Sequence, residues 1–210
     1  TNPMLNVLDI AQASSVAKAH GAMLVVDNTF ATPYLQRPLD LGADVVMHSG
    51  TKYLGGHSDA VLGLLATKDE KIAEKMYFIQ NASGAILGPM DSFIALRGIK
   101  TLHVRMDRHC ENGEAVANFL ANHPRVGKVY WPGLEGHNGH EVAKRQMKKF
   151  GGMVSFTVKD AGFESTAEVV SAMKVFTLAE SLGGVESLSG HPASMTHASI
   201  PRDKREKVGV

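Results

Sequence analysis

Apolar residues in the first third of the chain follow two different spacings. Over residues 7–20 they recur three and four positions apart, which predicts an amphipathic helix that stops at Gly21. Residues 22–26 and 45–47 are instead continuous apolar runs, as expected for strands buried on both faces of a sheet. Residues 63–66 form a third candidate strand. Helices and strands that alternate in this way predict a βαβ sheet and an α/β fold.

The middle of the chain has a helical pattern. Thr67 and Glu70 have the spacing of a capping box, so we expect a helix to begin after Thr67. Residues 90–122 are also helical in pattern, and Gly98 and Gly113 are expected to break or bend this helix.

The pattern changes near Gly98, where we place a domain boundary. Residues 1–97 are expected in a large domain, and residues 98–210 in a linking helix and part of a smaller α/β domain. In this second part we expect strands at residues 126–130 and 153–158 and a helix at residues 140–147. A further helix is expected after Ser165, which would form a second capping box with Glu168, and a last one is expected to begin at Pro201.

Composition excludes several classes of protein. The 210 residues are 44% hydrophobic and 20% charged, which is typical of a soluble globular protein. Because 22 basic residues nearly balance 21 acidic ones, no surface for nucleic acid or membrane is indicated. A single cysteine, Cys110, excludes an internal disulfide framework, and no apolar run reaches the length of about 20 residues that a membrane helix needs. We therefore expect a cytoplasmic location. Thr1 at the start and a helix that has barely begun at the end suggest an internal fragment of a longer protein.

The stretch of residues 48–59 contains the strongest candidate chemistry. Ser49, Thr51 and Lys52 follow directly after a predicted strand, where open α/β sheets bind their ligands. In an extended backbone the two hydroxyls would point to the same side and could share one phosphate. The amine of Lys52 can form an imine with an aldehyde, so this stretch is a candidate site for pyridoxal phosphate (PLP).

Asp27 also ends a predicted strand. Taken alone it could hold magnesium beside a nucleotide, but the chain lacks the Gly-rich phosphate loop that a nucleotide site would need. PLP needs a carboxylate opposite its ring nitrogen, which keeps that nitrogen protonated and the ring an electron sink. Asp27 and Lys52 on successive strands could approach one cofactor from two sides.

Four longer motifs resemble those of one enzyme family, and they occur in the same order along the chain as in that family. They are residues 25–33 (VVDNTFATP), 48–53 (HSGTKY), 178–188 (LAESLGGVESL) and 195–198 (MTHA). The family is the Cys/Met metabolism group of PLP-dependent enzymes, which includes cystathionine γ-lyase and cystathionine γ-synthase. The resemblance implies the fold-type-I transferase fold (aspartate aminotransferase-like), with a large domain built on a mainly parallel sheet and a smaller C-terminal α/β domain.

The resemblance implies a role for each matching residue in cofactor binding. Lys52 is similar to the lysine that forms the Schiff base and also acts as the catalytic base. Asp27 is similar to the partner of the pyridine nitrogen, and Ser49 and Thr51 to the hydroxyls that bind the phosphate. Gly50 stands where many relatives have alanine, a difference with little chemical content.

The resemblance also implies a substrate pocket and an assembly. Ser181 matches a residue beside the substrate carboxylate, and Asn2 matches an asparagine that lines the same pocket. Glu180 occupies a position that tunes substrate choice, and an acid there resembles the cystathionine enzymes. Family members form homotetramers, dimers of dimers in which a neighbouring subunit supplies a tyrosine and an arginine to the phosphate. Those two residues, an aromatic residue that stacks on the cofactor and the arginine that grips the substrate carboxylate all lie outside these 210 residues.

Several functions remain open at this stage. We favour cystathionine γ-lyase, an enzyme of transsulfuration, whereas cystathionine γ-synthase, which joins O-succinyl- or O-acetylhomoserine to cysteine, shares the visible motifs. A non-catalytic, truncated relative that acts in subunit association is a third hypothesis. No metal is expected, since His137 and His140 lack a third ligand at suitable spacing. Cys110 is expected to pack inside a helix, and Arg97, Arg105 and Arg108 are expected to form structural ion pairs.

Overall fold

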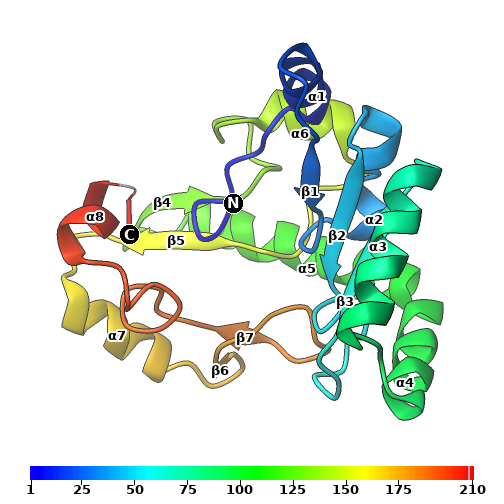
Figure 1. Cartoon of the computed structure of the whole chain (residues 1–210). Coiled ribbons are helices and arrows are strands. Elements are labelled where there is room, and N and C mark those ends of the chain that lie inside the picture. Colours follow the sequence, from blue (N-terminus) through cyan, green and yellow to red (C-terminus); the bar gives the residue numbers. More distant parts are fainter. Residues whose placement is uncertain (208) are drawn as a thin grey trace.

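A computed structural model describes residues 1–207 and 209–210 of the chain (Figure 1). Its strands are β1 (Val25–Asp27), β2 (Val45–Ser49), β3 (Gly63–Thr67), β4 (Val126–Tyr130), β5 (Ser155–Val158), β6 (Thr177–Leu178) and β7 (Leu188–Ser189). Its helices are α1 (Ile10–Ala19), α2 (Thr32–Leu35), the 3-10 helix η1 (Pro38–Leu41), α3 (Glu70–Ser83), α4 (Pro89–Lys100), α5 (Leu102–Ala121), α6 (His140–Gln146), α7 (Phe163–Ser171) and α8 (Arg202–Lys207).

The first half of the chain forms a mixed sheet in the order β1-β2-β3. β1 and β2 are parallel, because η1 and α2 form the crossover between them, whereas β2 and β3 are antiparallel. The expectation of a mainly parallel sheet is therefore wrong for these residues. The first apolar run is also not buried on both faces, since β1 is an edge strand in which Val25 is 55% exposed.

Helix α3 begins later than the sequence predicts. Its N-cap is Asp69, whose carboxylate accepts a hydrogen bond from the backbone N–H of Ile72 at 2.9 Å. Thr67 is the last residue of β3, and its hydroxyl donates to the carbonyl of Asp44 at 2.7 Å. The predicted capping box of Thr67 and Glu70 is therefore wrong, because the strand keeps Thr67 extended.

Replacing Asp69 with alanine is expected to reduce the free energy of unfolding by about 1 kcal/mol, because the backbone N–H of Ile72 in the first turn loses its side-chain acceptor. Urea unfolding followed by circular dichroism measures this change. Asp69→Asn keeps a capping oxygen and serves as the control. Equal loss in both variants would contradict a capping role.

The long helical pattern is split at Thr101 and not at a glycine. Thr101 lies between α4 and α5, and Gly98 and Gly113 lie inside these helices. Each glycine is a point where the helix meets another backbone: a Cβ on Gly98 would lie 2.8 Å from the carbonyl oxygen of Leu54, and one on Gly113 would lie 2.7 Å from that of Gly151. The prediction that glycine breaks this helix is wrong, because both glycines serve close packing.

The second half of the chain forms two small sheets. β4 and β5 pair antiparallel, and β6 and β7 pair parallel. The predicted strand 126–130 is confirmed, but the second capping box is wrong, since α7 starts before Ser165 with Gly162 as its N-cap. These sheets do not make up a complete C-terminal domain within the described residues, and the boundary near Gly98 stays a prediction.

One apolar cluster joins both halves of the chain. Leu35, Tyr53 and Leu54 from the first half pack against Met106 and Cys110 of α5. Met106 is fully buried, and the buried Cys110 confirms the expectation of a packed helix residue. Burial also raises the pKa of the Cys110 thiol, which keeps it protonated. Helix α5 therefore lies directly against the segment that carries Lys52.

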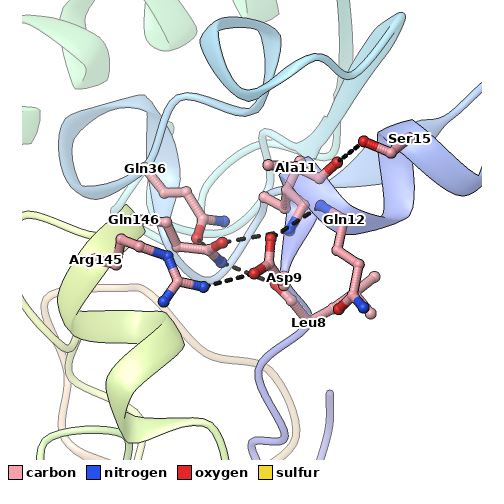
Figure 2. A network of polar contacts seen from close by, with 9 residues as sticks. Leu8, Asp9, Ala11, Gln12, Ser15, Gln36, Arg145 and Gln146 are labelled. Atoms are coloured by element: carbon pink, nitrogen blue, oxygen red, sulfur yellow. Dashed lines mark hydrogen bonds and ion pairs between the residues drawn. The ribbon is translucent and has the colours of Figure 1, made fainter.

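A polar network joins α1 to α6 (Figure 2). Asp9 is the N-cap of α1: it accepts a hydrogen bond from the N–H of Gln12 at 3.0 Å and an ion pair from Arg145 at 2.5 Å. Gln146 accepts from the N–H of Ile10 and donates to the carbonyl of Leu8. These bonds fix the start of the chain on the helix that precedes β5. Among the described residues, no helix is both long and apolar enough to span a membrane.

Candidate active site

Lys52 lies on a helical turn that follows β2. The N–H of Lys52 donates to the carbonyl of Ser49 at 3.2 Å, and the N–H groups of Gly55 and Gly56 donate to the carbonyls of Gly50 and Lys52 at 2.8 Å. We call residues 50–56 the lysine turn. Because the backbone curls here, it is not extended beyond Ser49. The argument that Ser49 and Thr51 face the same side of an extended strand is therefore wrong.

Asp27 and Ser49 lie at the ends of neighbouring strands. Asp27 is opposite Met47 in the parallel register, so the side chains of Asp27, Met47 and Ser49 share one face of the sheet. Thr29 connects the two strand ends: its N–H donates to Asp27 Oδ1 at 2.9 Å, and its hydroxyl accepts from the N–H of Ser49 at 2.8 Å.

The sequence reasoning missed this bridging role of Thr29. The signal available in the sequence is its spacing, since a residue two positions after an aspartate often donates its N–H to that carboxylate. Thr51 is engaged differently from the expectation of a free phosphate ligand. Its hydroxyl donates to the carbonyl of Leu62 at 3.3 Å and accepts from the N–H of Leu62 at 3.0 Å.

Lys52 contacts a segment that is far away in the sequence. Its Nζ donates a hydrogen bond to Ser181 Oγ at 3.0 Å. Ser181 has a φ of 97°, which is uncommon for a residue with a side chain. Figure 1 shows the segment between β6 and β7 reaching the loop that joins β2 to β3. The structure therefore brings together Lys52 and Ser181, two of the predicted site residues.

The same segment is held at two more points, one on the lysine turn and one just after it. Gly183 lies so near it that a Cβ there would be 2.6 Å from the backbone nitrogen of Tyr53. Ser58 donates to the carboxylate of Glu186 at 3.2 Å. Gly183 has a φ of 80°, so both its backbone conformation and its space require glycine.

The remaining predicted substrate residues are exposed. Glu180 directly precedes Ser181. Asn2 lies in the turn at the start of the chain, and within the described part of the chain no hydrogen bond connects its side chain to Lys52. The structure thus does not bring Asn2 together with the lysine by direct contact.

A chain of amide side chains supports the residue after Asp27. Asn28 is 2% exposed; its amide donates to the carbonyl of Gln36 at 2.9 Å and its oxygen accepts from Gln36 Nε2 at 2.8 Å. Gln36 in turn accepts from Gln146 Nε2 at 2.9 Å (Figure 2). Because every member of this chain of amides has a partner, it fixes the turn that follows Asp27.

His48, on β2 beside Ser49, is buried. Burial lowers its pKa, although the Asp27 carboxylate and a hydrogen bond to the backbone of Asn28 act in the opposite direction. Burial and the charge of Arg105 likewise lower the pKa of His109. In the unfolded chain both imidazoles would titrate near the ordinary value of 6.5.

The free energy of unfolding is therefore expected to fall as the pH drops below about 6.5, because the unfolded chain then binds protons at these two histidines that the folded chain does not bind. Above that pH the two imidazoles are neutral in both the folded and the unfolded chain, so their full contribution to the free energy of unfolding is present. Urea midpoints at about pH 8 and about pH 5.5 measure the effect. His48→Asn, which cannot titrate, should show a smaller difference between the two midpoints, and an unchanged difference would exclude His48 as a source.

Other candidate groups have structural partners. His137 and His140 are buried and bind the carbonyl oxygens of Leu5 and Pro132 at 2.9 and 2.8 Å. Among the residues that the structure describes, no group of three His, Cys, Asp or Glu side chains could hold a metal ion.

The donor set fits pyridoxal phosphate. In the described part of the chain Lys52 forms no ion pair, so its amine is available to an aldehyde. One oxygen of Asp27 is held by Thr29, and the carboxylate is exposed toward the same face as Ser49. These groups lie at or just after the ends of adjacent strands. The amine suits the aldehyde of the cofactor, the carboxylate suits its ring nitrogen, and the hydroxyl suits its phosphate.

A family model described as Cys/Met metabolism PLP-dependent enzyme matches residues 1–210. The chain belongs to this family. Its cofactor is therefore pyridoxal phosphate, and its mixed α/β fold is that of fold-type-I PLP-dependent enzymes.

Relatives in this family have different activities. The chain is 56% identical to a cystathionine β-lyase of Lactococcus lactis subsp. cremoris (strain MG1363) over 210 residues, all of this chain and 55% of the relative. It is 54% identical to a cystathionine γ-lyase of Dictyostelium discoideum, over all of this chain and 54% of the relative.

A solved structure agrees with these relatives. A cystathionine γ-synthase from Xanthomonas oryzae pv. oryzae, in complex with aminoacrylate and cysteine, matches all of this chain and 54% of its own chain with a TM-score of 0.95 and 47% identity. The chain thus spans about half the length of the proteins that it matches.

Proposed function

We propose that this chain carries the cofactor lysine of a cystathionine γ-lyase, which converts cystathionine and water into cysteine, 2-oxobutanoate and ammonia. The observation that carries the proposal is the 3.0 Å hydrogen bond from Lys52 Nζ to Ser181 Oγ, next to the strand ends that present Asp27 and Ser49. The 54% identity to a cystathionine γ-lyase supports the choice of reaction.

Each proposed site residue has a chemical role. Lys52 would hold the cofactor aldehyde, Asp27 would keep a proton on the ring nitrogen, and Ser49 and Thr51 would bind the phosphate. When bound, the cofactor supplies an electron sink for negative charge at the substrate carbon atoms. Thr51 can serve the phosphate only if its hydroxyl exchanges its bond with Leu62.

Lys52 would then move protons. Once its amine is free, Nζ can remove the proton from the substrate α-carbon and return a proton at another atom of the substrate. Ser181 accepts the hydrogen bond from Nζ and so keeps the amine directed toward the substrate side of the lysine turn. Ser181 is proposed to lie beside the substrate carboxylate, Asn2 to line the same pocket, and Glu180 to influence substrate choice.

A cystathionine β-lyase is a second candidate, which the sequence reasoning did not consider. The 56% identity to such an enzyme favours it. The two lyases break different carbon–sulfur bonds of the same substrate: β-elimination of cystathionine releases homocysteine, pyruvate and ammonia. The site residues described above serve both reactions, since each begins with removal of the α-proton.

Product analysis separates these activities. Holoprotein is incubated with cystathionine, and the products are identified by mass spectrometry. Cysteine with 2-oxobutanoate supports the γ-lyase, and homocysteine with pyruvate would replace this proposal with the β-lyase. A parallel incubation with O-succinyl- or O-acetylhomoserine and cysteine tests the γ-synthase, whose product is cystathionine. Turnover of this second mixture alone would reject both lyases.

A truncated relative without activity is the remaining alternative. It would bind partner subunits but would not form a covalent link to PLP through Lys52. Reduction with borohydride followed by peptide mass spectrometry tests this: a modified Lys52 peptide excludes the inactive scaffold, and an unmodified one supports it.

We also propose a homotetramer, a dimer of dimers whose subunits share active sites, in the cytoplasm. Large exposed apolar side chains support subunit association, among them Phe78 of α3 and Phe93 and Leu96 of α4, which are 70%, 60% and 64% exposed. Light scattering on the purified protein measures the assembly, and a monomer would contradict it.

A further inference from the structure

Arg105 of α5 has contacts unlike those expected from the sequence. It forms no ion pair with any carboxylate among the described residues. Its guanidinium instead donates to backbone carbonyls: Nη1 to Tyr53 at 2.6 Å and Nη2 to Gly98 at 2.7 Å, with Leu54 at 3.5 Å. The expectation of an ion pair is therefore wrong for Arg105, although Arg108 does pair with Glu111 at 3.5 Å.

The carbonyls of Tyr53 and Leu54 belong to the lysine turn. They lie near the C-terminal end of this helical turn, where backbone carbonyls lack partners and a cation is favoured. Arg105 is half-buried, and burial lowers the pKa of its guanidinium. A neutral side chain at this position would leave these carbonyls without their donors.

Glycines allow this close approach. Gly56, with a φ of 75°, lies directly against the guanidinium, and a Cβ there would collide with it. Gly98 brings α4 onto the carbonyl oxygens of Leu54 and Gly55. The Nε of Arg105 donates to Thr101 Oγ1 at 3.0 Å, which fixes the side chain at the junction of α4 and α5. The lysine turn is thus seated on two helices through backbone atoms.

We propose that Arg105 is a positioning residue for Lys52, acting through the carbonyls of the lysine turn to hold Nζ against Ser181. This inference rests on the proposed role of Lys52 as the cofactor lysine. Arg105 does not contact the reacting atoms. Loss of its donors is expected to let the turn shift, so that Nζ is misplaced relative to the substrate α-carbon.

The test compares Arg105→Ala and Arg105→Lys with the control Arg108→Met, an exposed arginine on the same helix. We expect kcat to fall by about 10- to 100-fold in Arg105→Ala, since a displacement near 1 Å has effects of this size. KM should change by less than about threefold, because substrate contacts are intact.

Two further readouts distinguish positioning from general damage to the fold. Guanidinium ion added at concentrations that do not unfold the protein should restore part of the activity of Arg105→Ala but not change that of Arg108→Met. The pH dependence of the absorbance of the Lys52-bound cofactor should shift in Arg105→Ala, and less in Arg105→Lys. The proposal would be overturned if the Arg105 variants matched Arg108→Met in kcat, in their response to guanidinium ion and in the pH dependence of the absorbance.

Amide hydrogen exchange gives a test that needs no cofactor. The N–H groups of Gly55 and Gly56 close the lysine turn and should exchange faster in the folded Arg105→Lys variant than in Arg108→Met. Unchanged exchange would overturn the proposal even if the protein did not bind PLP at all. Failure of wild-type protein to form the borohydride-reducible link would reject the role of Lys52 instead.

Discussion

Replacing Lys52 with alanine is expected to abolish the covalent link to the cofactor and to lower the turnover of cystathionine by at least about 10³-fold. The residue is proposed to act twice, as the amine that holds the aldehyde and as the base that moves the substrate proton. Its hydrogen bond to Ser181 shows that Nζ is directed toward the segment between β6 and β7. No other amine in the described structure shares this contact.

The measurement combines absorbance of the bound cofactor, borohydride reduction and an assay of 2-oxoacid release. Lys71→Ala, at an exposed position of α3, is the matched control and should behave like the wild-type protein. A yellow, borohydride-sensitive Lys52→Ala protein would show that another lysine holds the cofactor. In that case the proposed site would be wrong.

Replacing Gly98 with alanine is expected to destabilise the protein by about 1–3 kcal/mol, as for other overpacked sites. The helix propensity of the two residues predicts the opposite sign, since alanine is favoured over glycine by about 1 kcal/mol inside a helix. Tertiary packing decides the sign because a Cβ on Gly98 would lie 2.8 Å from the carbonyl oxygen of Leu54 and would also collide with that of Gly55.

Urea unfolding of Gly98→Ala measures this change in stability. Gly136→Ala is the control, because a Cβ at this exposed turn meets no atom within 4 Å. Cofactor binding should weaken in Gly98→Ala as well, since α4 supports the lysine turn. A more stable Gly98→Ala protein would mean that α4 can move away from the turn without loss.

The pattern of apolar residues predicted the strands well where they are short continuous runs. The runs at residues 45–47 and 63–66 became β2 and β3, of which β2 is largely buried and β3 is mostly exposed. The pattern did not determine the direction of pairing, which depends on whether a crossover or a reversal joins two strands. Nor did it indicate that Val25 would be exposed.

Helix ends were predicted less well. Thr67 and Ser165 have the spacing of capping residues, yet Asp69 and Gly162 are the N-caps. A capping signal is local and occurs at several neighbouring positions, and the extent of the preceding strand decides which one is used. Gly98 was interpreted as a helix breaker because glycine is unfavourable inside helices, but it lies inside α4, where the lack of a Cβ lets the helix pack against Leu54 and Gly55.

By itself the sequence determined the family of this protein and, through the family, its cofactor. The candidate lysine, aspartate and serine lie in the motifs HSGTKY, VVDNTF and ESLGG, and the order of these motifs identified the family before any coordinates. Only the tertiary structure decided how Lys52 is held. Its hydrogen bond to Ser181 joins residues 129 positions apart, and the contact of Arg105 with carbonyls joins two helices to one turn. The physical reason is that side-chain chemistry is a property of each residue, whereas close approach of backbones arises only when distant segments pack together.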